Sequence, residues 1–129
     1  MTRTEAIKLV GRFIDEELPQ AEWYQKIASV VKAVIFYGSR AKEINRPDSD
    51  IDILLIVPLE VEKKYTAGEY FFQYEGWEIN IVLRSIERLR SIAEEGIDVS
   101  EAEIFRKSEI IWESNDEVRG LVEKIKSIQ

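Results

Sequence analysis

Two aspartates separated by one residue, Asp50 and Asp52, open an apolar segment and are the first candidates for chemistry. Residues two apart in a strand face the same side, so both carboxylates are expected to project together. Neighbouring carboxylates repel each other unless a cation lies between them, and the surrounding "DSDID" contains no Lys or Arg. A hard divalent ion, Mg²⁺ or Mn²⁺, takes oxygen ligands and removes that repulsion. The pair therefore predicts a metal site, with an ordinary polar turn as the alternative.

Gly38, Ser39 and Arg40 form a second candidate group directly after another apolar segment, and ten residues separate Ser39 from Asp50. Glycine lets a ligand approach the backbone closely, and serine supplies a hydroxyl donor and a good helix N-cap. If a helical turn starts at Ser39, its N–H groups and dipole face an anion, and Arg40 adds a positive charge. These residues are expected to hold nucleotide phosphates, whereas the alternative is an ordinary Gly-Ser turn.

The composition excludes several kinds of chemistry. The chain has no Cys and no His, so disulfides, thiolate metal sites and a Ser-His-Asp triad are ruled out. Its formal net charge of −7 argues against broad binding to nucleic-acid phosphates. No apolar run approaches the roughly 18 residues of a membrane span, and the N-terminus lacks the apolar core of a signal peptide. We therefore expect a cytoplasmic protein with a single domain over residues 1–129.

Strands must position these candidate residues, and runs of β-branched and aromatic residues predict them. Such runs occupy residues 30–38, 51–57 and 109–113. A further segment, "EYFFQYEGWEINIVL", predicts two strands around a turn at Glu75 and Gly76. The sheet is therefore expected to contain about four or five strands.

Helices are predicted where apolar residues recur at three- and four-residue steps, over residues 4–18, 20–29 and 85–96. Ser114 and Glu117 match a capping box, which is expected to begin a last helix. Helices and strands that follow one another in this irregular order predict an α+β fold, with a small mixed β-sheet flanked by helices.

The segment "GSRAKEINRPDSDIDILLIV" resembles the signature of the DNA-polymerase-beta-like nucleotidyltransferases, and within them it is most similar to the minimal nucleotidyltransferases. That signature is Gly-Ser, a ten-residue gap and Asp-x-Asp, which Gly38, Ser39, Asp50 and Asp52 match here. The resemblance implies the polymerase-beta-like fold, ATP or another NTP as substrate, and a site for divalent metal. It also implies a third carboxylate on a neighbouring strand.

Glu78 and Asn80 are the candidates for that third position, because they share one face of the strand expected after Gly76. Asn80 stands where many relatives carry Asp, and a neutral amide is a poor metal ligand that cannot act as a base. Two outcomes are open. Either Glu78 reaches the metal and acts as ligand or base, or the site has only two carboxylates and catalyses weakly.

The resemblance implies a Mg²⁺-dependent enzyme that moves a nucleoside monophosphate, AMP from ATP, to a hydroxyl group and releases pyrophosphate. The acceptor is a small molecule or a protein residue. Because such domains often accompany a helical partner of the HEPN type, the resemblance further implies an antitoxin of a toxin–antitoxin pair. The alternative is a catalytically weak module that binds a nucleotide or a partner protein on the same scaffold. The sequence leaves the oligomeric state open, a homo-oligomer included.

Overall fold

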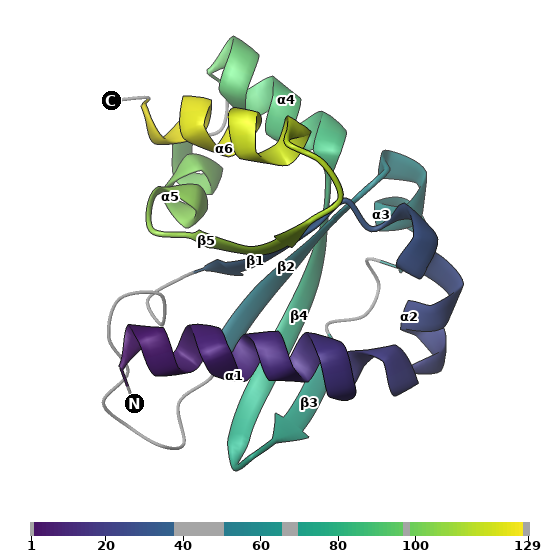
Figure 1. Ribbon diagram of the computed structural model, residues 1–129. Coiled ribbons are helices and arrows are strands. Elements are labelled where there is room, and N and C mark those ends of the chain that lie inside the picture. The colour runs from purple at the N-terminus through teal and green to yellow at the C-terminus, as the bar shows by residue number, and fades with distance from the viewer. Residues whose placement is uncertain (1, 38–50, 66–69, 97–98, 128–129) are drawn as a thin grey trace.

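The structure is a computed structural model of the chain, and it describes residues 2–37, 51–65, 70–96 and 99–127. Five strands form one sheet in the order β3-β4-β2-β1-β5 (Figure 1). Their bounds are β1 (Ala33–Tyr37), β2 (Ile51–Val57), β3 (Tyr70–Tyr74), β4 (Trp77–Ser85) and β5 (Glu109–Glu113). β2 and β4 run parallel, whereas the other neighbouring pairs are antiparallel. The sheet is therefore mixed, which confirms the predicted fold class.

Helices cover both faces of this sheet (Figure 1). They are α1 (Arg3–Glu16), α2 (Glu22–Ile27), α3 (Leu59–Tyr65), α4 (Ile86–Glu95), α5 (Val99–Arg106) and α6 (Glu117–Lys126), with short 3-10 turns at Leu18–Gln20 and Ala28–Val30. Residues of α1 and α2 pack on one face, against side chains such as Phe36, Ile53 and Ile81. Residues of α4, α5 and α6 pack on the other face, against Ile35 and Leu54 among others. Two apolar cores therefore lie on opposite sides of the same strands.

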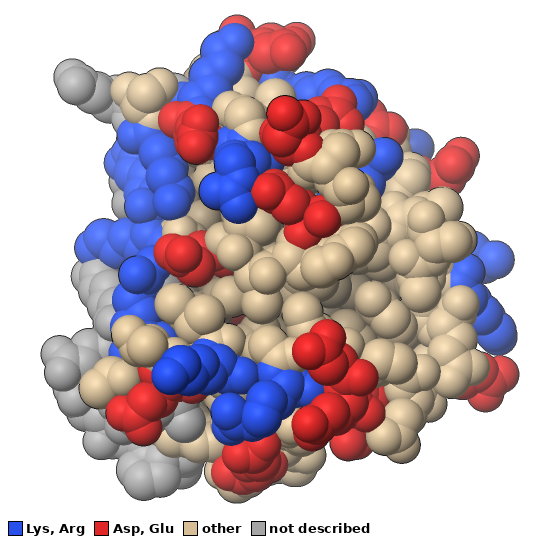
Figure 2. Space-filling view, viewed as in Figure 1, with Lys and Arg blue, Asp and Glu red and all other residues tan. Residues whose placement is uncertain are grey.

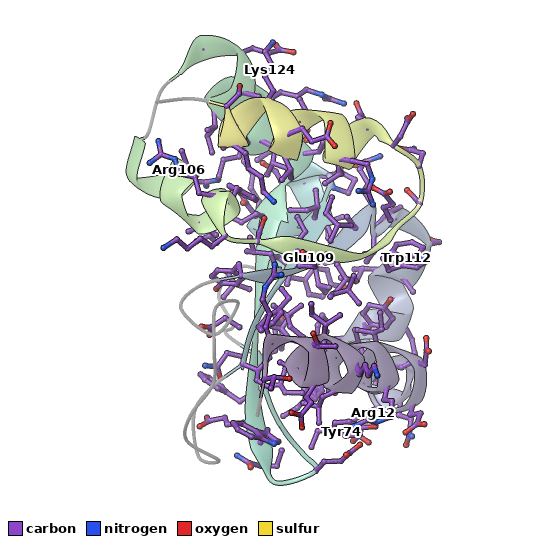
Figure 3. All side chains as sticks on the ribbon, turned by 60° about the vertical axis from the view of Figure 1, so that its left-hand side comes forward. Arg12, Tyr74, Arg106, Glu109, Trp112 and Lys124 are labelled. Atoms are coloured by element: carbon purple, nitrogen blue, oxygen red, sulfur yellow. The ribbon has the colours of Figure 1, made fainter. Side chains whose placement is uncertain are left out.

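The β3–β4 hairpin turns at Glu75 and Gly76, which both have positive φ angles, of 48° and 84°. Glycine adopts such angles without strain, and two of them in a row fit the twist of a hairpin. The hairpin is also tied to α1, because Arg12 donates two hydrogen bonds to the Glu75 carboxylate, at 3.1 and 3.0 Å. Tyr74 donates a further one to Glu16, at 2.8 Å, and Figure 3 shows Arg12 and Tyr74 together beside α1. These contacts fix the strand that carries Glu78 and Asn80.

The far end of β4 is held by a buried carboxylate. Glu62 of α3 is 5% exposed, and its Oε1 accepts a hydrogen bond of 2.9 Å from the backbone N–H of Ser85. Arg88 lies 3.4 Å from the same oxygen. Ser85 in turn caps α4 through a 3.0 Å bond from the Arg88 N–H, and Gly96 ends the helix in the left-handed conformation. The Glu62 carboxylate is tolerated in the core because both Ser85 and Arg88 contact it. These contacts join α3, β4 and α4.

Some local predictions fail. α3 and α5 were not predicted, because seven and eight residues are too short to display a full apolar stripe. The capping box of Ser114 and Glu117 is absent: α6 begins at Glu117, whose N–H bonds to the Asn115 side chain at 2.9 Å. Ser114 instead donates its N–H and its hydroxyl to the Lys32 carbonyl. The short helical segment expected after Ser39 lies outside the described residues.

Candidate active site

One row of cross-strand neighbours runs across four strands at the end of β2 where Asp52 lies. Tyr37 of β1 pairs with Asp52, Asp52 pairs with Asn80 of β4, and Asn80 pairs with Phe71 of β3. Directly paired residues point to the same face of a sheet. The four side chains therefore form a continuous row on the face that α4, α5 and α6 cover elsewhere.

The row marks the point where this face opens to solvent. One step deeper, Leu54 pairs with Val82, and Leu54 is completely buried. At the next position outward, Asp52 and Asn80 are half-buried, and Phe71 is 56% exposed. A half-buried carboxylate beside an apolar core keeps its access to a ligand while losing part of its hydration.

Asn80, and not Glu78, lies directly opposite Asp52. The Asn80 amide nitrogen donates a hydrogen bond of 3.4 Å to Asp52 Oδ1, a long and weak bond. Glu78 is on the same face but two residues further along β4, where it pairs with Gln73. Strand spacing and rise put its Cα roughly 8 Å from that of Asp52. Glu78 therefore needs its longer side chain to reach a ligand that Asp52 holds.

The structure thus brings together Asp52, Asn80 and Glu78 from the sequence candidates. Gly38, Ser39, Arg40 and Asp50 lie outside the described residues, and their proposed roles rest on the sequence. Within the described part of the chain, no group of three His, Cys, Asp or Glu side chains is placed to hold a metal ion. Asp52 and Glu78 nevertheless offer hard oxygen ligands on one face, with the amide of Asn80 between them, and such ligands suit Mg²⁺ or Mn²⁺.

A basic flank lies on the β1–β5 side of the row. It consists of Arg3 at the start of α1, Arg106 and Lys107 at the end of α5, and Lys126 at the end of α6. Lys126 bonds to the Ser108 carbonyl at 3.0 Å, and Arg3 bonds to Glu109, the first residue of β5, at 2.8 Å.

The position of this basic flank follows from the strand pairing, because Glu109 lies opposite Phe36, one residue before Tyr37. Figure 2 shows Lys and Arg gathered on the left, over α5 and the ends of α1 and α6, and Figure 3 shows Arg106 and Glu109 on that side. In a chain of net charge −7, such a cluster favours anions locally.

Sequence reasoning missed two features of this region. Phe71 carries a usable signal, because strict alternation in "YFFQY" separates Phe71 and Gln73 from the inward-facing Tyr70, Phe72 and Tyr74. No sequence pattern predicts the basic flank, since its four residues come from three separate segments.

Among the described residues, no helix is both long enough and apolar enough to cross a bilayer.

Comparison with solved structures agrees with this architecture. The chain is similar to the crystal structure of a nucleotidyltransferase-like protein from Exiguobacterium sibiricum 255-15, with a TM-score of 0.53 and 13% sequence identity. The similarity covers 87% of this chain and 38% of that protein. The chain therefore shares its fold with part of a larger protein. None of the curated proteins compared with the chain matches it.

The family follows from the sequence. The model of the nucleotidyltransferase domain family matches residues 21–113, a range that contains all five strands and the row described above. The chain belongs to this family, which is part of the DNA-polymerase-beta-like superfamily. The resemblance carried by Gly38, Ser39, Asp50 and Asp52 is thereby confirmed at the level of the superfamily.

Proposed function

We propose that this chain is a metal-dependent nucleotidyltransferase that moves AMP from ATP to a hydroxyl group of a small molecule or a protein. The supporting observation is the row of Asp52 and Asn80 at the open rim of the sheet, in a chain of the nucleotidyltransferase domain family. Asp52 follows Asp50 by two residues, so a strand continuing toward Asp50 would present both carboxylates on one face.

Asp50, Asp52 and Glu78 would hold Mg²⁺ or Mn²⁺, which when bound neutralises phosphate charge and aligns the reacting groups. In the reaction, the acceptor oxygen attacks the α-phosphorus of ATP and forms a new P–O bond. The bond from that phosphorus to the bridging oxygen breaks, and pyrophosphate leaves with the electron pair. The Glu78 carboxylate takes the acceptor proton, and the Asn80 amide donates its weak hydrogen bond to Asp52.

Gly38, Ser39 and Arg40 would hold the triphosphate, because they follow Tyr37 of β1 directly and supply backbone N–H groups, a hydroxyl and a positive charge. The basic flank of Arg3, Arg106, Lys107 and Lys126 supports this assignment. It lies at the same end of β1 and attracts the polyphosphate. A phosphate-bearing substrate would therefore enter from the β1–β5 side.

A second candidate function is a nucleotide-binding or partner-binding module with weak catalysis. The observation that favours it is Asn80 opposite Asp52, because an amide neither neutralises a second metal charge nor accepts a proton. In either case, a helical partner of the HEPN type remains our proposal for the protein acceptor, as part of a toxin–antitoxin pair.

The test is transfer of labelled AMP from ATP, measured as pyrophosphate release and as mass gain on the chain and on the product of the neighbouring gene. Wild type is expected to transfer AMP in the presence of Mg²⁺, and Glu78→Gln is expected to lower the rate by about a hundredfold or more. Equal rates for wild type and Glu78→Gln, with Asp52→Asn inactive, would remove Glu78 from the mechanism. No transfer by wild type, together with intact ATP binding, would favour the binding module.

A further inference from the structure

The two sides of the candidate site differ in chemistry. On the β1–β5 side stand the cations Arg3, Arg106, Lys107 and Lys126. On the β3–β4 side the row ends with Phe71, whose side chain has no basic neighbour in the ladder: Phe71 pairs with Asn80, and Gln73 with Glu78. Phosphates are attracted to the first side, and the second side offers an aromatic surface beside amide and carboxylate groups.

Among the described residues, Phe71 is the most exposed large apolar side chain, at 56%. Two further large apolar side chains are exposed, Trp112 at 44% and Val30 at 39%. Single exposed apolar residues are common on protein surfaces. Phe71 differs because it shares a row with Asp52 and lies two strands away from it, roughly 10 Å by strand spacing. A planar ring stacked on Phe71 would thus carry a hydroxyl on a short linker toward Asn80 and Asp52.

In-line displacement decides which substrate occupies this side. The attacking oxygen and the leaving pyrophosphate lie on opposite sides of the reacting phosphorus. With the polyphosphate on the β1–β5 side, the acceptor approaches over β4 and β3. The acceptor, and not the nucleotide, therefore meets Phe71.

We propose that Phe71 is the aromatic platform of an acceptor subsite, and that the acceptor carries its hydroxyl on a short linker from a planar ring. This inference rests on the proposed nucleotidyl transfer for the position of the phosphates. The ring stacks on Phe71, and Gln73 provides a polar contact at its edge. The hydroxyl lies over Asn80, within reach of the Glu78 carboxylate that takes its proton. Polyols without a ring lack this contact and bind weakly.

The test uses para-fluorophenethyl alcohol as the probe and follows its fluorine NMR line width during titration with protein. Phe71→Ala is expected to weaken binding of the probe by about tenfold relative to wild type. Trp112→Ala is the matched control, because it removes an exposed aromatic ring from the opposite edge strand, and it is expected to leave binding within about twofold. Addition of ATP and Mg²⁺ is expected to leave the probe bound.

Two results would overturn the subsite directly: no binding of the probe by wild type, or equal weakening of binding by Phe71→Ala and Trp112→Ala. Displacement of the probe by ATP would also overturn it, because Phe71 would then contact the adenine ring. Asp52→Asn separates this proposal from the proposed function. If Asp52→Asn keeps both the probe and the affinity for ATP with Mg²⁺, the metal site fails while the aromatic subsite stands.

Discussion

The two faces of β2 perform different tasks along the same seven residues. On the α1 face, Ile51, Ile53 and Leu55 are all completely buried, up to the first described residue of the strand. On the opposite face, Leu54 is just as buried, but Asp52 one step outward is half-buried and belongs to the row. The core that α1 and α2 form with the sheet therefore buries this face of the strand from Ile51 to Val57, whereas burial on the opposite face decreases from Leu54 to Asp52.

This difference explains how a small domain can hold charged groups in fixed positions. The carboxylate of Asp52 is attached to a strand whose opposite face is closely packed. The packing holds the backbone in place, so the position of the carboxylate varies little. Substitutions on the α1 face should therefore change stability, and substitutions in the row should change ligand binding. Three predictions test that separation.

Ile53→Ala is expected to have the largest effect. Ile53 is fully buried between α1 and the sheet, and removing such a side chain costs about 2–5 kcal/mol of unfolding free energy, because a cavity remains. Urea denaturation measures it, with Val30→Ala as a control at an exposed apolar position that should change stability by less than about 0.5 kcal/mol. A loss below about 1 kcal/mol for Ile53→Ala would mean that the α1 face is not the structural one.

Asn80→Asp is expected to have an intermediate and ion-dependent effect. A carboxylate directly opposite Asp52 adds repulsion, so the variant should lose about 1 kcal/mol of stability in EDTA and regain it with Mg²⁺. Thermal unfolding with and without Mg²⁺ measures this. Asn115→Asp makes the same chemical change at an exposed position before α6 and should show no dependence on Mg²⁺. If the two variants respond alike, the row does not bind metal.

Arg12→Ala is expected to have the smallest effect, and it depends on pH. The hydrogen bonds from Arg12 lower the pKa of Glu75 below its ordinary value of 4.5. A lowered pKa gives stability that is present above pH 4.5 and is lost as the pH falls through the lowered value. The difference in stability between wild type and Arg12→Ala should therefore shrink below pH 4.5. A difference that stays constant down to pH 2.5, roughly two units lower, would show that the contact between Arg12 and Glu75 contributes nothing.

Much of the fold could be predicted because strong local patterns specify it. The β-branched runs of β1 and β2, the hairpin at Glu75 and Gly76, and the helix that ends at Gly96 were all predicted and are present. Helix caps show the limit of such patterns. Thr2 and Glu5 form a true capping box on α1, whereas Ser114 and Glu117 have the same spacing and do not. Ser114 finds its partner in Lys32, far away in sequence, and a local pattern cannot include that contact.

The candidate site could be predicted only in part, for a related reason. Alternation along β4 places Glu78 and Asn80 on one face, but it does not say which of them stands opposite Asp52. That register is set by two parallel strands whose connection contains α3 and β3, so turn geometry does not fix it. The exposed position of Phe71 at the sheet edge and the basic flank depend on the strand order in the same way.

The most direct test of the metal and nucleotide site is calorimetric binding of ATP in the presence of Mg²⁺ to wild type and Asp52→Asn. Wild type should bind ATP, and removal of Mg²⁺ or the Asp52→Asn change should weaken binding by about tenfold or more, because the carboxylate no longer holds the ion. The unfolding free energy of the variant should stay within about 1 kcal/mol of wild type. Equal, Mg²⁺-independent binding of ATP by both proteins would contradict the site.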